Sequence, residues 1–416
     1  MPGFQEGAVN LSFLATVVFL ALAVAPALAG QDQWTTIQRG LYLTRAGDCE
    51  ACHTADPAKR MAGNFALQTP FGIIYTANLT PDPETGIGKW NADDFYQAMT
   101  KGREPDGTRL YPAFPYTHFT ILKREDSDAI FAYLKTLEPI DQRIRPPEFT
   151  WPLTWRFLMR GWNLINFKPH PFQPDPQKSA VWNRGKYLVE GLGHCGMCHS
   201  PKDVLGAEKD SGRYSGGEVE GWWAPSLSGD KRDGIGDWSK DDLVSFLKYG
   251  RNDKSAAFGP MTDVIEHSTQ YLNDQDLGAI ATYVKEIPAR NDKEPARLSD
   301  DQNRQAQSVG GQIYAAQCSA CHAPDGSGVP TMFGPLKGSS VAQSRNPETV
   351  IRAVLEGVRS APTDKYPTPH SMPSFAWKLT DGEVAAVVNY VRNSFGNRAA
   401  GVDAGEVHAI REKPSS

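Results

Sequence analysis

Apolar residues recur with helical spacing in three stretches that lie more than a hundred residues apart. Because side chains at this spacing share one face of a helix, each stretch predicts a core helix that closes a domain. A shorter apolar segment that opens on glycine predicts a first helix in each domain. The closing stretches are 129–134, 279–284 and 386–391, and the opening segments are 40–43, 185–188 and 311–314.

The N-terminus carries an uncharged apolar stretch over residues 11–28, followed by small residues in an A-x-A pattern at 27–29. This pattern is typical of a secretory signal peptide, so we expect residues 1–29 to be removed and the mature chain to start near Gly30. The alternative is an uncleaved anchor, because about 20 apolar residues can span a bilayer. Both interpretations place residues 35–416 outside the cytoplasm.

All six cysteines fall in three copies of C-x-x-C-H. This spacing lets two thiols on one turn of chain bond the vinyl groups of a haem while the adjacent imidazole reaches the iron. Structural zinc needs four ligands in one place, and a thioredoxin-type pair does not require the histidine. The motif therefore predicts three covalently bound haem c groups. The attachment residues are Cys49, Cys52, Cys195, Cys198, Cys318 and Cys321, and the proximal iron ligands are His53, His199 and His322.

Internal similarity indicates separate domains. Residues 86–90 (GIGKW) recur as 234–238 (GIGDW), and neighbouring matches keep the same offset of 148. We therefore expect an all-α protein with three consecutive class I cytochrome c-like domains and few strands. The predicted order is a signal peptide at 1–29, cytochrome c domains at 35–140, 180–290 and 305–398, a linker at 141–178 and a polar tail at 399–416.

A haem that only transfers electrons usually has a second axial ligand, and methionine raises its potential. Met261 in the second domain and Met372 in the third lie on loops before the last helix, 62 and 50 residues after the motif histidines. Both are expected distal ligands.

In the first domain the matching loop position is Phe114, which cannot bind iron. His118, Met99 or Met61 could take its place, or this iron keeps an open position. The residues alone leave these alternatives open.

The linker at 141–178 is rich in proline and aromatic residues. Trp155, Leu158, Met159, Trp162 and Ile165 follow helical spacing and predict a short amphipathic helix. Such a helix is expected to contact a bilayer interface, a partner subunit or the neighbouring domains.

Composition narrows the range of partners. The chain has 416 residues, 43 basic and 48 acidic side chains and a net charge of -5, without a strongly basic segment. Nucleic acid is therefore not an expected partner.

With these motifs in place, the chain resembles the triheme cytochrome c subunits of membrane-bound periplasmic dehydrogenases, which serve quinoprotein alcohol dehydrogenase and flavoprotein gluconate, sorbitol and fructose dehydrogenases. The resemblance covers residues 35–398 and implies a relay from a catalytic subunit through three haems toward ubiquinone or a terminal oxidase. It also implies a periplasmic location at the outer face of the bacterial inner membrane. The residues that carry it are 46–53, 86–90, 191–195, 258–261 and 372–375.

Phe114 departs from the better-known members of this family, and relatives with phenylalanine resemble partners of molybdenum hydroxylases. The catalytic partner is thus expected to be of quinoprotein, flavoprotein or molybdenum type, and no catalytic residue is expected in this chain. Two other functions are compatible with the motifs. The first haem could act as a peroxidase-like centre, or the protein could be a free soluble carrier.

Overall fold

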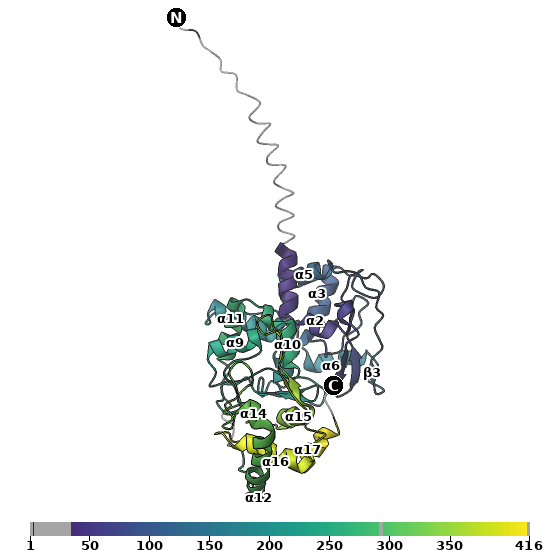
Figure 1. Ribbon diagram of the computed structural model, residues 1–416. Coiled ribbons are helices and arrows are strands. Elements are labelled where there is room, and N and C mark those ends of the chain that lie inside the picture. Colours follow the sequence, from purple (N-terminus) through teal and green to yellow (C-terminus); the bar gives the residue numbers. More distant parts are fainter. Residues whose placement is uncertain (1–2, 4–34, 291–293, 414–416) are drawn as a thin grey trace.

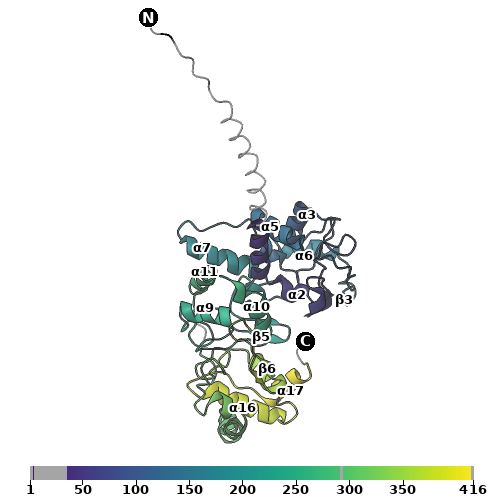
Figure 2. The same cartoon turned by 45° about the horizontal axis from the view of Figure 1, so that its top comes forward.

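The computed structural model describes residues 35–290 and 294–413, together with Gly3. The predicted signal peptide, apart from Gly3, and the predicted mature start at Gly30 lie outside these residues. Figures 1 and 2 show the purple-to-blue and teal parts of the chain side by side, with the green-to-yellow part at one end. Among the described residues, no helix has both the length and the apolar character that a bilayer span requires.

Most regular structure is helical, as predicted. A helix over residues 35–46 leads into the first C-x-x-C-H motif. The α-helices that follow are α2 (Cys49–His53), α3 (Ala92–Lys101), α4 (Tyr116–Phe119), α5 (Arg124–Leu134), α6 (Leu158–Asn166), α7 (Ala180–Tyr187), α8 (Gly196–His199), α9 (Lys240–Tyr249), α10 (Met261–His267), α11 (Asp274–Val284), α12 (Asp300–Gln305), α13 (Gly311–Ile313), α14 (Ser319–His322), α15 (Glu348–Glu356), α16 (Asp381–Asn393) and α17 (Ala404–Arg411). Two short 3₁₀-helices are η1 (Pro57–Lys59) and η3 (Thr269–Tyr271). Three π-helical turns are η2 (Leu188–Leu192), η4 (Ala306–Gly310) and η5 (Tyr314–Cys318).

The strands are two to four residues long and form antiparallel ribbons on the loops. Residues 220 and 221 join β4 to β5 with positive φ at both positions, the geometry of a tight hairpin. The strands are β1 (Ala66–Thr69), β2 (Gly72–Tyr75), β3 (Glu148–Phe149), β4 (Gly217–Val219), β5 (Trp222–Ala224), β6 (Val358–Arg359) and β7 (Ser371–Met372).

We call residues 35–140, 180–290 and 305–398 the first, second and third parts of the chain. In each part, the first and last helices cross at a glycine. A Cβ added there would lie 1.9, 2.0 or 2.2 Å from a carbonyl oxygen of the last helix, so only glycine allows this approach. In the third part the contact falls at Gly310, one residue before the glycine that opens the predicted segment. The pairs in contact are Gly40 with Ala129, Gly185 with Ala279, and Gly310 with Ala386.

The offset of 148 has a local structural cause in α3 and α9. Asn91 and Ser239 cap the two N-termini, and in each helix the aspartate at the third helical position returns a hydrogen bond to the capping residue. Gly102 and Gly250 end the same helices in the left-handed conformation. The repeated residues are therefore the start and stop signals of one recurring helix.

The predicted linker packs against the first part of the chain. β3 pairs with β2, and Tyr116 donates a 2.6 Å hydrogen bond to Asn163 of α6. The predicted amphipathic helix is present as α6, with Met159 buried. Its apolar stripe is not wholly buried, because Ile165 is 69 % exposed.

The predicted polar tail contains an ordered helix. Asp403 caps α17 in a capping box, and Val407 is buried against α15 and α16. Arg411 donates to the carboxylate of Asp381 at 2.7 Å. The sequence offered few apolar residues in this segment, but one valine and one arginine fix it to the third part.

The first and second parts of the chain meet at the carboxylate of Asp276, which belongs to the second part. Asp276 of α11 accepts hydrogen bonds from Arg184 of α7 at 2.7 and 2.8 Å. It also accepts a 2.6 Å hydrogen bond from the hydroxyl of Tyr42, which comes from the first part.

The same contact is repeated in the opposite direction. Asp126 of α5 accepts from Arg39 at 2.5 and 3.0 Å within the first part and from the Tyr187 hydroxyl of the second part at 2.6 Å. We call these two arrangements together the tyrosine–aspartate junction. Each part therefore inserts a tyrosine of its first helix beside the aspartate of the other part's last helix.

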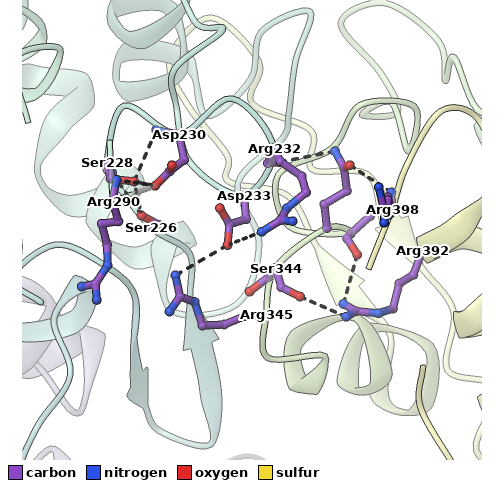
Figure 3. A network of polar contacts seen from close by, with 12 residues as sticks. Ser226, Ser228, Asp230, Arg232, Asp233, Arg290, Ser344, Arg345, Arg392 and Arg398 are labelled. Carbon is purple, nitrogen blue, oxygen red and sulfur yellow. Dashed lines mark hydrogen bonds and ion pairs between the residues drawn. The ribbon is translucent and has the colours of Figure 1, made fainter. Parts of the chain in front are cut away.

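The second and third parts meet in a polar network (Figure 3). Buried Asp233 lies 3.8 Å from Arg232 and 3.9 Å from Arg345. Arg392 of α16 is also buried and donates to backbone carbonyls of the loop 342–344 at 3.0 Å. Burial lowers the pKa of Arg392 to about 10. Backbone carbonyls thus accept from this buried cation.

Candidate haem-binding site

The C-x-x-C-H motifs form three short helical turns, and all six cysteines are free. The third motif ends α14, and its Cys321 is exposed, whereas the cysteines of the first two motifs are partly buried. The first two motifs lie close together. A Cβ at Gly47 would lie 3.4 Å from the Leu192 side chain, and Asp48 acts electrostatically on Cys198.

Each motif histidine is oriented by a backbone carbonyl. A carbonyl oxygen only accepts, so the Nδ1 atom beside it carries the proton in a neutral ring and Nε2 keeps its lone pair. Among the described residues, no hydrogen bond engages these Nε2 atoms. The Nδ1 contacts are His53 to Ala77 at 2.7 Å, His199 to Pro225 at 2.7 Å and His322 to Gly334 at 3.2 Å.

Sequence reasoning missed these carbonyl residues, although a signal was present. Ala77 and Pro225 differ by the same offset of 148 that relates the other repeats. In all three parts the acceptor lies two residues before a leucine. Only the structure shows that this repeat supports the histidine, since backbone carbonyls leave no side-chain signature.

Burial favours the uncharged form of four of the thiols and of the three motif imidazoles. Burial raises the pKa of Cys49 and Cys195 to about 12 and that of Cys198 and Cys318 to about 11. Burial lowers the pKa of all three motif histidines. A neutral imidazole with a free Nε2 can bind iron, and two unpaired thiols beside it can form thioethers. The donor set therefore fits covalent haem.

The two methionines expected as distal ligands both precede the last helix of their part, but they lie in a helix and a strand and not on loops. Met261 begins α10 after Gly259, whose φ of 59° turns the chain, and it packs half-buried against the cluster of Ala257, Ile265 and Ala361. Met372 lies in β7, opposite Val358 of β6, and is also half-buried. Both thioethers are apolar groups that remain partly accessible.

The first part differs around Phe114. The Phe114 ring packs on Phe119 with centroids 5.5 Å apart. Met61 and Met99 are both buried in the same core cluster. Met61 follows the motif closely, and its backbone nitrogen donates to Thr54 at 3.0 Å.

His118 faces the second part of the chain. Its Nδ1 lies 3.0 Å from the carbonyl oxygen of Glu190, and its Nε2 bonds the carboxylate of Glu208. Both ring nitrogens are thus engaged. Burial opposes ionisation of Glu208, but the contact with His118 outweighs it and lowers the pKa of this carboxyl.

His194 lies beside His118, with ring centroids 6.5 Å apart. Burial lowers the pKa of His194 to about 4, so this ring is neutral. These histidines fill the contact between the first two parts. The spacing along the chain offered no sign of this, because His118 and Glu208 are 90 residues apart.

Residues 308–395 match the family model described as Cytochrome c. The chain is 41% identical to the gluconate 2-dehydrogenase cytochrome c subunit of Pantoea cypripedii, over 96% of this chain and 93% of that protein. It is 38% identical to the cytochrome c subunit of the quinone alcohol dehydrogenase of Gluconobacter oxydans, over 95% of this chain and 86% of that protein. The chain belongs to this family of dehydrogenase cytochrome c subunits.

The family resemblance expected from the motifs is thus confirmed. This cytochrome c subunit is also 39% identical to one of the subunits of the nicotinate dehydrogenase of Pseudomonas putida, over 92% of this chain and 33% of that longer protein. The family shares an electron-transfer role, and its members are named for dehydrogenases of different substrates.

Proposed function

We propose that this cytochrome c subunit carries three haem c groups in consecutive domains at 35–140, 180–290 and 305–398, and relays electrons from a catalytic dehydrogenase subunit. The observation that carries the proposal is the threefold Nδ1-to-carbonyl contact beside two free thiols. One such site could be incidental to a fold. Three with the same donor arrangement support one repeated cofactor.

Each residue has a defined role in this proposal. Bound haem supplies an iron that takes up and releases one electron. The cysteine pairs form the thioethers, and His53, His199 and His322 are the proximal ligands. Met261 and Met372 are the distal ligands of the second and third domains. The carbonyls hold each ring in the tautomer that leaves Nε2 to the metal.

The partner is a catalytic subunit of quinoprotein, flavoprotein or molybdenum type. The relatives, which are named for gluconate, alcohol and nicotinate dehydrogenases, support a dehydrogenase as the partner. The acceptor is ubiquinone or a terminal oxidase. The A-x-A pattern at 27–29 supports a periplasmic location, at the outer face of the bacterial inner membrane.

Solvent exposure supports an order for the relay. The first two motifs lie against each other, while Cys321 of the third is exposed. Electron transfer between proteins requires close approach at an accessible cofactor edge. We therefore place exchange with a protein partner at the third domain and internal transfer between the first two.

Mass spectrometry of the exported protein tests the proposal. We expect a mass increase of three haems, and a loss of one haem for each cysteine pair replaced by alanine. A wild-type protein with fewer than three haems would refute the proposal. Replacing Cys318 and Cys321 should leave the other two haems in place, which separates loss of a site from general misfolding.

A further inference from the structure

The segment between the first two domains exposes a row of large apolar side chains. Trp151, Trp155 and Phe157 are 71, 48 and 61 % exposed, and successive ring centroids are 5.6 Å apart. Leu164 and Ile165 of α6 are 85 and 69 % exposed. We call these five residues the aromatic face.

Helix geometry holds this face outward. Phe157, Gly161, Leu164 and Ile165 share one side of α6 by their spacing, and a Cβ at Gly161 would meet no atom within 4 Å. The opposite side is fixed to the body of the protein. Met159 is buried there. The exposure is therefore a stable feature of the fold.

The Trp162 indole provides a second anchor, donating a 2.9 Å hydrogen bond to the carbonyl of Leu205. This bond brings the turn at 204–205 next to α6. Val204 and Leu205 are themselves 90 and 44 % exposed, so the apolar surface extends beyond the linker.

The charge of the segment differs from that of the whole chain. The protein has a net charge of -5, yet residues 149–174 contain Arg156, Arg160 and Lys168 and no acidic residue. Arg160 and Lys168 are exposed, and within the described residues neither takes part in an ion pair. The segment thus combines the aromatic face with two exposed cations, Arg160 and Lys168, that have no ion-pair partner among the described residues.

We propose that the aromatic face seats on a bilayer interface with anionic headgroups. Tryptophan favours the headgroup level of a membrane, and arginine and lysine attract anionic lipid. A protein partner would equally bury the rings, but the one-sided charge favours an anionic lipid surface. The proposal rests on the proposed function, since it locates the surface by which the electron-transfer subunit meets the membrane.

Vesicle flotation with the haem-loaded protein tests this proposal. We expect binding to phosphatidylcholine vesicles that contain phosphatidylglycerol, and weaker binding to phosphatidylcholine alone or at high salt. The double variant Trp151→Ala/Phe157→Ala should bind at least about tenfold more weakly, because two rings no longer enter the interface. Arg160→Gln/Lys168→Gln should weaken binding roughly thirtyfold.

Trp377→Ala provides the matched control, because Trp377 is 81 % exposed but lies in the third domain. It should bind vesicles as the wild type does. Equal binding by the control and both double variants would overturn the proposal, as would absence of vesicle binding by the wild type. Loss of a copurifying catalytic subunit in the double variants, with vesicle binding unchanged, would assign the face to a protein instead. Haem content separates these outcomes from failure of the relay itself, which would show as missing haems.

Discussion

At the scale of single residues, the distal ligands give the sharpest test. Met261→Ala should remove the methionine-to-iron absorption of one haem and lower its potential, because the thioether favours the reduced iron. Met332→Ala is the control, since Met332 is 45 % exposed and outside the proposed ligand set. Optical titration checks both variants. An unchanged spectrum in Met261→Ala would exclude this ligand.

Phe114 allows the converse experiment. Phe114→Met places a thioether at the loop position that matches Met261, in a half-buried aromatic cluster. We expect an additional methionine-to-iron band and a higher potential for the first haem. His118→Gln should leave the spectrum of the first haem unchanged, because both ring nitrogens of His118 already bond Glu190 and Glu208. If Phe114→Met leaves the spectrum unchanged, the loop does not reach the iron.

The C-x-x-C-H motifs were predictable from single residues, but the contacts that hold the neighbouring histidines in place were not. A thioether site needs two cysteines at one fixed spacing, so the sequence alone is enough to recognise Cys49 and Cys52 as attachment residues. His118 gave only a local clue, and its partner Glu208 belongs to another domain. Side-chain chemistry at fixed spacing is readable, whereas a contact made by folding is not.

At the scale of helices, the crossing glycines determine how closely the first and last helices approach. Gly185→Ala would place a Cβ 2.0 Å from the carbonyl oxygen of Ala279, so the helices must separate. We expect a loss of about 2–3 kcal/mol in the free energy of unfolding. Denaturant unfolding followed by circular dichroism measures it.

Gly278→Ala in α11 is the matched control, because an added Cβ there meets no atom within 4 Å. It should stabilise the helix by about 0.5–1 kcal/mol. Equal effects of the two substitutions would mean that the crossing tolerates a methyl group.

Elements were predictable where local signals agreed with packing. Asn91 and Gly102 cap the two ends of α3, and Ser239 and Gly250 cap those of α9, so local signals mark where both helices begin and end. α17 was missed because its stabilising contacts, such as that of Arg411 with Asp381, come from a distant segment. α6 was predicted, but which of its apolar residues are buried depended on the surface that it covers.

At the scale of the whole molecule, the tyrosine–aspartate junction joins the first two parts of the chain. Tyr42 and Asp276 are 234 residues apart, so no local pattern could reveal their contact. The junction is reciprocal because both domains use the same two helices. Both tyrosines follow a crossing glycine by two residues, which places each hydroxyl beside the other domain's last helix. The repeat thus creates an interface as well as two similar folds.

Asp276 makes this junction sensitive to acid. Burial raises its pKa, but hydrogen bonds from Arg184 and Tyr42 outweigh burial and lower it. A carboxyl whose pKa is lowered in the folded state stabilises fully above its ordinary value, about 3.9, and this contribution is lost as the pH falls through the folded value. We expect the protection of residues 35–46 and 274–284 against hydrogen exchange, relative to the intrinsic rate at each pH, to fall below about pH 4.

Tyr42→Phe should accelerate the same exchange at neutral pH, with a loss of about 1.5–3 kcal/mol for a hydrogen bond to a charged group. Asp276→Asn should flatten the acid dependence, because the amide does not titrate in this range. Tyr75→Phe is the control, since Tyr75 bonds Glu148 of the predicted linker and takes no part in the junction. If Tyr42→Phe and Tyr75→Phe behave alike at the junction, the two domains are held together by apolar packing, and the reciprocal hydrogen bonds only follow from it.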